Sequence, residues 1–318
     1  MKRKTRQAAM LTAVALAFLL FNAALFTLGT WRCLPSTDRG LRAKAIELDR
    51  YLPFDDDSEI VKVTGQLALS GELPVIDSAS ALYPVTSAFV HALYPESAVE
   101  FDGSDFTKDS RLQMRNTVGA YRAVVDGDSD IVVCAAPSEQ QLQYAEQQGV
   151  QLRLVPIGRE AFVFLTSSRN PVTSLTLQQI RGIYAGDYTF WSQLGGPHTP
   201  ILPLQRAEGS GSQSAFLSFM EGQPTKKNYL GFLGAAIGFS FRFYVEDVVA
   251  NGNVRMLAVD GVYPDLEGVT SGGYPLVSEF YAVYDAANDN PNIPLLIDWF
   301  LSEQGQGIIE QTGYLPLA

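Results

Sequence analysis

"DIVVCAAPSEQQLQYAEQQGVQLRLVPIG", residues 130–158, combines two apolar stretches with a polar one between them. Residues 130–137 are an apolar run bounded by turn residues, which is typical of a buried strand. Residues 138–149 have the pattern of a polar helix, and residues 152–158 return to an apolar, strand-like run. A strand, a helix and a second strand in this order predict a parallel sheet covered by helices.

The same alternation continues on both sides of this segment, without an internal repeat. It predicts further strands and helices that succeed one another along most of the chain. The expected strands are 73–77, 161–168, 235–244, 254–261 and 279–286, and the expected helices are 83–95, 120–127, 176–187 and one or two within 292–313. This pattern indicates the α/β class.

Composition limits the possible partners. The chain has 318 residues, 47% of them hydrophobic, and a formal net charge of -11, which argues against a nucleic-acid partner because phosphate backbones require a basic surface. A small anion remains possible, since local amides and a single arginine can set the field inside a cleft. Two cysteines and two histidines make a zinc site unexpected.

The N-terminus has the pattern of a membrane segment. Residues 1–7 carry four cations, and residues 8–29 carry no charge over a length sufficient to span a bilayer. We therefore expect a signal or anchor segment at 1–30, with the rest of the chain outside the cytoplasm. An uncleaved anchor is favoured over cleavage or lipidation at Cys33, and residues 31–65 are expected to form a tether and docking segment.

Three turns from strand to helix share one design. In residues 77–84, 116–124 and 205–220, small or hydroxyl-bearing residues precede a helical pattern, and Arg206 adds a positive charge to the third. A helix N-terminus presents unpaired N–H groups and a partial positive charge, so it favours an anion. Each turn is also compatible with ordinary N-capping by Ser or Thr, and both interpretations stay open at this point.

Five segments of the chain, in order and with similar spacing, resemble the phosphate-binding proteins of ABC importers. They are 72–96, 116–141, 155–191, 205–216 and 235–244, and the likeness covers about residues 66–318. The resemblance implies a periplasmic-binding-protein fold: two α/β lobes joined by a two-strand hinge, with an anion between them. By this analogy lobe one is 66–159 plus 278–318, lobe two is 160–277, and the hinge lies near 156–162 and 275–281.

The resemblance also implies a set of anion contacts. They are Ser80, Ala81, Leu82, Thr117, Arg206, Ser210, Gly211 and Ser212, with Ala81 and Leu82 contributing backbone amides. Arg206 would supply the charge, and Glu208 corresponds to an acidic residue that could orient its guanidinium. One position departs from the family, because Ala135 stands where an Asp often accepts the proton of hydrogen phosphate. The identity of the oxyanion is therefore left open.

The function implied is that of a monomeric, extracytoplasmic solute-binding protein. It would capture inorganic phosphate, or a similar tetrahedral oxyanion, for an ABC permease in the membrane, without a cofactor or catalytic residues. The alternative is a membrane-anchored sensor or interaction protein that reuses the fold, which the expected anchor and Ala135 both motivate. An enzyme is disfavoured, because the chain has neither a Gly-Lys-Ser/Thr phosphate loop nor a Gly-x-Ser-x-Gly elbow.

Overall fold

The computed structural model describes residues 46–228, 230–231, 234–247 and 253–317. The expected signal or anchor segment and Cys33 lie outside the described residues. In the part of the chain that is described, no helix combines the length and apolar character needed to cross a bilayer.

A mixed sheet carries the fold. In the described residues it has the strand order β2-β1-β3-β10-β4-β7-β6, with β8 paired to β4. Its strands are β1 (Ile76–Ser78), β2 (Leu112–Gln113), β3 (Ile131–Ala135), β4 (Leu152–Ser167), β6 (Ile201–Pro203), β7 (Ala235–Phe241), β8 (Val254–Met256) and β10 (Val277–Asp285). A small separate sheet pairs β5 (Ser174–Leu175) with β9 (Ala258–Val259).

Helices cover this sheet, as the α/β pattern predicts. The α-helices are α3 (Tyr83–Leu93), α4 (Asn116–Asp126), α5 (Glu139–Gln148), α6 (Leu177–Ala185), α7 (Gly211–Met220), α8 (Arg242–Asp247), α9 (Leu266–Thr270), α10 (Asn292–Leu301) and α11 (Glu303–Thr312). Short 3₁₀ turns are η1 (Leu48–Tyr51), η2 (Ser80–Leu82), η3 (Glu96–Ala98) and η4 (Trp191–Leu194).

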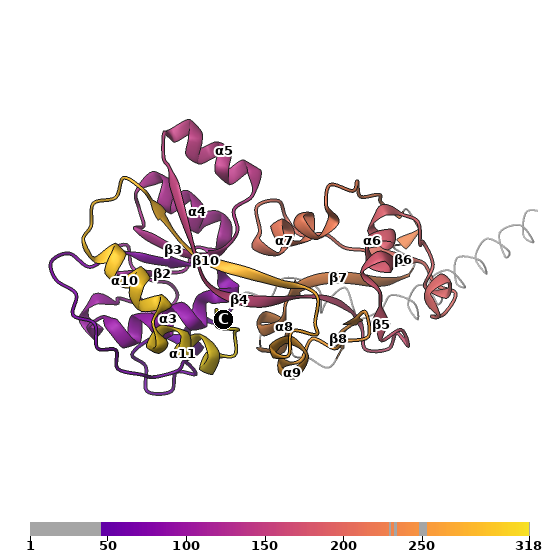
Figure 1. The fold of residues 1–318 in the computed structure, drawn as a ribbon, viewed down its shortest axis with the longest axis horizontal. Coiled ribbons are helices and arrows are strands. Elements are labelled where there is room, and N and C mark those ends of the chain that lie inside the picture. Colours follow the sequence, from indigo (N-terminus) through magenta and orange to yellow (C-terminus); the bar gives the residue numbers. More distant parts are fainter. Residues whose placement is uncertain (1–45, 229, 232–233, 248–252, 318) are drawn as a thin grey trace, which may run out of the picture.

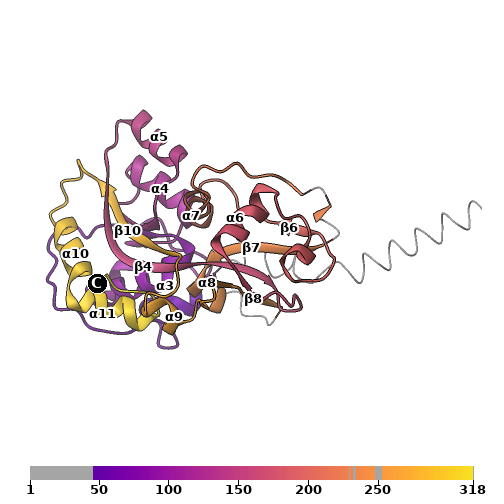
Figure 2. The same cartoon turned by 45° about the vertical axis from the view of Figure 1, so that its right-hand side comes forward.

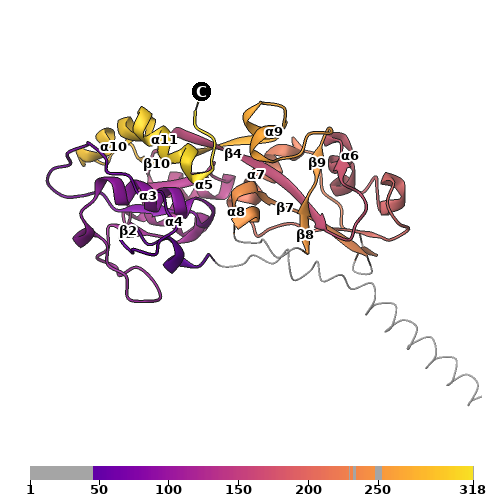
Figure 3. The same cartoon turned by 90° about the horizontal axis from the view of Figure 1, so that it is seen from below.

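One long strand, β4, links the two halves of the molecule. Its first part, to Ala161, pairs antiparallel with β10, and from Phe162 onward it pairs antiparallel with β7. The two strands expected at 152–158 and 161–168 are therefore one continuous strand. Figures 1 and 3 show β4 running from one half of the molecule into the other.

The expectation of a purely parallel sheet is wrong for the centre of the sheet. β1 pairs in parallel with β2 and β3, and β6 pairs in parallel with β7. β10, however, lies between β3 and β4 and is antiparallel to both. The segment at 130–158 therefore forms two strands of the same direction, separated by a strand from near the C-terminus.

Two other boundaries differ from expectation. The strand expected at 235–244 ends at Phe241, and Arg242 begins α8. The strand expected at 254–261 divides into β8 and β9, which belong to different sheets. The remaining expected helices and strands are present with small shifts of their ends.

Separate apolar cores fill the two halves. The first packs α3, α10 and α11 against β1, β3 and β10, with the rings of Phe89 and Phe300 stacked at 4.5 Å. The second packs α6 and α7 against β7 and the second part of β4, with Phe216 and Phe239 stacked at 4.4 Å. A further cluster lies between α4, α5 and β3. The boundaries expected between lobe one and lobe two, at 159/160 and 277/278, fall within β4 and at the start of β10. The division into these two lobes stays a proposal.

Gly158→Ala should lower the free energy of unfolding, because a Cβ at this position would lie 2.3 Å from Cζ of Phe280. Gly158 is the direct partner of Phe280 across β4 and β10, so the ring or the strands must move, at a cost of about 1–3 kcal/mol.

The matched control Gly307→Ala, inside α11, meets no atom closer than 3.8 Å. It should leave stability unchanged or raise it by up to about 1 kcal/mol. Urea unfolding followed by circular dichroism measures both variants, and a Gly158→Ala protein as stable as the parent would contradict this packing.

Candidate functional site

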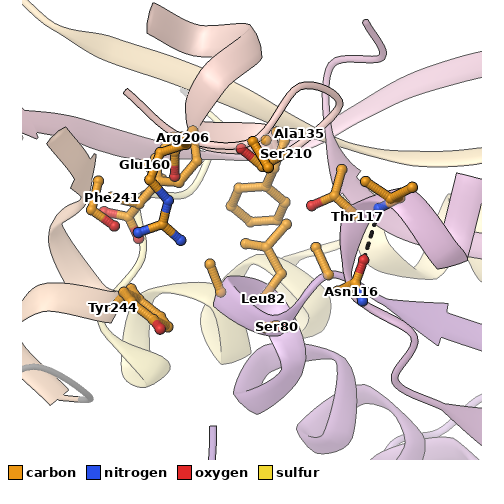
Figure 4. A pocket seen from close by; sticks show the side chains of 18 of the residues that line it. Ser80, Leu82, Asn116, Thr117, Ala135, Glu160, Arg206, Ser210, Phe241 and Tyr244 are labelled. Carbon is orange, nitrogen blue, oxygen red and sulfur yellow. Dashed lines mark hydrogen bonds between the residues drawn. The ribbon is translucent and has the colours of Figure 1, made fainter. Parts of the chain in front are cut away.

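One cavity collects residues from both halves of the molecule. Its volume is about 430 Å³, and Figure 4 shows its labelled side chains converging from several elements. All eight residues of the expected anion set line it: Ser80, Ala81, Leu82, Thr117, Arg206, Ser210, Gly211 and Ser212. It is also lined by Ala79, Asn116, Val118, Ala135, Glu160, Ala207, Ser240, Phe241, Tyr244, Glu279 and Phe280.

The turn before α3 begins one wall of the cavity. Ser80 opens η2, and its hydroxyl donates to the thioether sulfur of Met114 at 3.4 Å. The backbone N–H of Leu82 donates to the carbonyl of Ala79 at 2.9 Å. Ser80 therefore does not cap a helix through its side chain, and the Leu82 amide, expected to face an anion, donates within the turn in this conformation.

Asn116 shapes the second turn and was not among the expected residues. It has a left-handed backbone with φ of 56°, a conformation that Asn tolerates well, and its Oδ1 accepts from the N–H groups of Val118 and Gly119 at 3.0 and 3.3 Å. Thr117 follows in the first turn of α4 and lines the cavity. An Asx cap of this kind is visible in sequence only as an Asn ahead of a helical pattern.

A partly buried ion pair fixes that turn. Asp77 is fully buried at the end of β1, where it accepts from the backbone N–H of Arg115 at 3.0 Å and from its guanidinium at 2.7 Å. Burial raises the pKa of Asp77, while Arg115 acts in the opposite direction. Because Arg115 immediately precedes Asn116, this pair holds the N-terminus of α4 against β1.

The third turn leads from Arg206 into α7. Ser210 is the N-cap of this ten-residue helix, and its Oγ accepts from the N–H of Gln213 at 3.3 Å. Gln213 is buried, and its Oε1 accepts from the backbone N–H of Arg206 at 2.9 Å, so it fastens the turn to the helix. The first N–H groups of α7, at Gly211 and Ser212, have no carbonyl within the helix to bond. Gln213 was not predicted, because a polar residue in a helix gives no signal of such a role.

Arg206 supplies positive charge to the cavity. Its side chain lines the cavity, and among the described residues it makes no ion pair within 4.0 Å. Glu208 was expected to orient the guanidinium, but it is exposed and lines neighbouring depressions outside the cavity instead. The structure gives no hydrogen bond between the two side chains.

The two halves meet directly beside the cavity. A Cβ on Gly211 would lie 3.1 Å from Cβ of Ala135, so the start of α7 packs closely against the end of β3. Gln141 of α5 also donates through Nε2 to the carbonyl of Gly209 at 3.1 Å. In Figures 1 and 2, α7 accordingly lies beside α4 and α5 where the two halves meet.

Glu160 brings a carboxyl group to the cavity and was not among the site residues expected from the sequence. It lies on β4, is 3% exposed and lines the cavity. Its Oε1 accepts from the N–H of Ala161 at 2.9 Å and lies 3.9 Å from Nε of Arg242. Burial raises the pKa of Glu160 to about 8, although Arg242 acts to lower it. At neutral pH this carboxyl group is therefore largely protonated.

Known proteins resemble this chain over most of its length. Residues 75–304 match the family described as "PBP superfamily domain". Protein SphX of Synechococcus elongatus is 24% identical over 287 residues, which cover 77% of this chain and 84% of SphX. The phosphate-binding protein PstS of Borreliella burgdorferi is 24% identical over 178 residues, which cover 50% of this chain but only 63% of that protein's length.

Solved structures share the fold. A Clostridium perfringens protein, assigned provisionally as a phosphate ABC transporter substrate-binding protein and crystallised with bound phosphate, is 25% identical. The alignment covers 77% of this chain and 99% of that one, with a TM-score of 0.57. An ABC-type phosphate transport receptor from Vibrio cholerae is 18% identical, covering 76% of this chain and 99% of that one, with a TM-score of 0.52; it supports the fold alone.

The raised pKa of Glu160 predicts a pH-dependent stability. Between the ordinary pKa of 4.5 and about 8, the folded protein holds a proton that the unfolded chain releases. This group alone should therefore lower the free energy of unfolding as pH rises through that window, by up to about 1.4 kcal/mol per pH unit. Glu160→Gln should lack this slope. Urea unfolding of both proteins between about pH 5 and pH 8 measures it, and parallel profiles would show that Glu160 is ionised throughout.

Proposed function

Because this chain belongs to the PBP superfamily, we propose that it is an extracytoplasmic substrate-binding protein of an ABC importer that captures inorganic phosphate or a similar tetrahedral oxyanion. One observation carries the proposal: a single cavity is lined by Ser80 and Thr117 from one half and by Arg206 and Ser210 from the other. The names of the Borreliella burgdorferi and Clostridium perfringens relatives, which refer to phosphate, support the choice of ligand.

The cavity has the groups that such a ligand needs. A tetrahedral oxyanion accepts many hydrogen bonds, and a buried one must have them filled. The first amides of α7 and the hydroxyl groups of Thr117 and Ser212 are donors on different sides of the cavity, and the Ser80 hydroxyl would become one by exchanging its bond to Met114 for the anion. Ser210 retains a hydroxyl proton to donate, because its oxygen serves as acceptor in the helix cap. Arg206 would neutralise the charge through a planar, bidentate guanidinium.

The fold offers a means of closing on the ligand. β4 and β10 pair with each other where the two halves join, so a small change of twist in these strands would rotate one half against the other. Contacts made to the anion from both halves would then stabilise the closed form. We propose that this closed form, presented outside the membrane, is what the permease recognises.

Arg206→Ala should weaken phosphate binding strongly while leaving the fold intact. A hydrogen-bonded charge contact is worth about 1.5–3 kcal/mol, so the affinity should fall by about tenfold to a hundredfold or more. Isothermal titration calorimetry of the full chain in detergent, with phosphate and with sulfate, measures this loss.

Arg169→Ala is the matched control, since it removes the same charge from the same half of the chain at an exposed position outside the cavity. It should bind like the parent. If Arg206→Ala bound phosphate as tightly as Arg169→Ala, Arg206 would not belong to the site. If the parent chain bound neither anion, the proposed function would be wrong.

A further inference from the structure

We propose that Glu160 contacts the bound oxyanion as a protonated carboxyl group and donates a hydrogen bond to an anion oxygen that carries no proton. This inference rests on the proposed function and concerns the selectivity of the same cavity. It assigns a role at the junction of β4 with β10 and β7, where the sequence analysis expected only a hinge.

The position of Glu160 and its hydrogen bonds point to this role. Its side chain is buried, and the residue lines the cavity on the same side as Arg206, as Figure 4 shows. Oε1 is occupied as an acceptor from the N–H of Ala161, whereas Oε2 is buried without a hydrogen-bond partner among the described residues. A buried polar atom without a partner is costly, and a ligand in the adjoining cavity can remove that cost. A proton on Oε2 would donate a hydrogen bond to an oxyanion in the cavity.

Desolvation favours the neutral form of Glu160, against the positive charge of Arg242 and the backbone N–H groups of Ala161 and Phe243. Arg242, at the start of α8, is 5% exposed and makes its closer ion pair with Glu246 of the same helix. The buried guanidinium of Arg242 therefore lies near two carboxyl groups. Glu160 is the farther one, with its Oε1 3.9 Å from Nε of Arg242. Glu279 of β10 lines the same cavity and adds negative charge, while Arg206 adds positive charge from the turn before α7. Desolvation by burial, with a smaller contribution from the charge of Glu246, outweighs Arg242 and the two N–H groups and raises the pKa of Glu160 to about 8.

The consequence is a selectivity that changes with pH. Below about pH 8 the cavity presents a donor at Glu160 and, with Ala135, no carboxylate at the end of β3, so sulfate and hydrogen phosphate can both bind. Above that pH, ionised Glu160 repels sulfate, which has no proton to offer. Hydrogen phosphate still carries one proton and can donate it to the carboxylate. The preference for phosphate over sulfate should therefore rise with pH.

Calorimetric titrations of the full chain in detergent with sulfate and with phosphate, at about pH 6.5 and about pH 9.5, test this inference. The affinity for sulfate should fall at least about tenfold between the two pH values, and the affinity for phosphate should fall less. Glu160→Gln keeps an N–H donor at every pH, so its affinity for sulfate should change less than about threefold. Glu279→Gln is the matched control: it removes a carboxylate from the same cavity and should retain the parent's loss of sulfate binding.

Proton uptake gives a second measurement that needs no variant. Near pH 8, sulfate binding should draw protons onto Glu160, so the binding enthalpy should depend on the ionisation enthalpy of the buffer. Sulfate binding without proton uptake, or with the same pH profile in Glu160→Gln and the parent, would overturn the inference and leave the proposed function standing. Absence of binding by the parent at both pH values would overturn both.

Discussion

The structure depends on the shared pairing of β4, a single sixteen-residue strand. Its N-terminal part is held by β10 and its C-terminal part by β7, so the two halves are joined through continuous backbone rather than through a loose linker. The requirement for close pairing explains why Gly158 lies opposite the ring of Phe280. Next to this pairing, Glu160 is buried beside the buried Arg242 of α8.

The sequence predicted the class and most of the elements, but not how the centre of the sheet is assembled. The pattern at 130–158 indicates local strands and a helix, and those are present. It contains no information about β10, which comes from far along the chain and separates β3 from β4. The strands expected at 152–158 and 161–168 leave out Arg159 and Glu160, because periodicity cannot distinguish a buried carboxyl group from an exposed turn. Similarly, the apolar run that ends β7 continues into α8 without a signal in hydropathy.

The candidate site was selected largely through resemblance, and the structure brings the eight selected residues to one cavity. Physical reasoning from the residues predicted helix N-termini but left ordinary capping open. Capping is confirmed for Ser210, which also lines the cavity, and its contact with an anion stays a prediction. What sequence reasoning missed are residues that act through long-range contacts. Gln213 and Asn116 stabilise the turns through side-chain bonds to backbone, and Glu160 reaches the cavity from a strand that looked like a hinge alone.

In a chain with a net charge of -11, an ionised carboxylate beside the cavity would weaken the attraction of Arg206 for the proposed anion. In this cavity, desolvation rather than distance keeps Glu160 from opposing the charge of Arg206. Ionised Glu160 would offset the charge of Arg206, but burial makes ionisation costly and keeps the carboxyl group neutral at neutral pH. Arg242 does not reverse this, because its closer partner is Glu246. Because burial keeps Glu160 neutral, the positive potential of Arg206 and of the α7 amides is not cancelled in the cavity. In the proposed complex, the same burial makes Glu160 a hydrogen-bond donor to the anion instead of a charge that repels it.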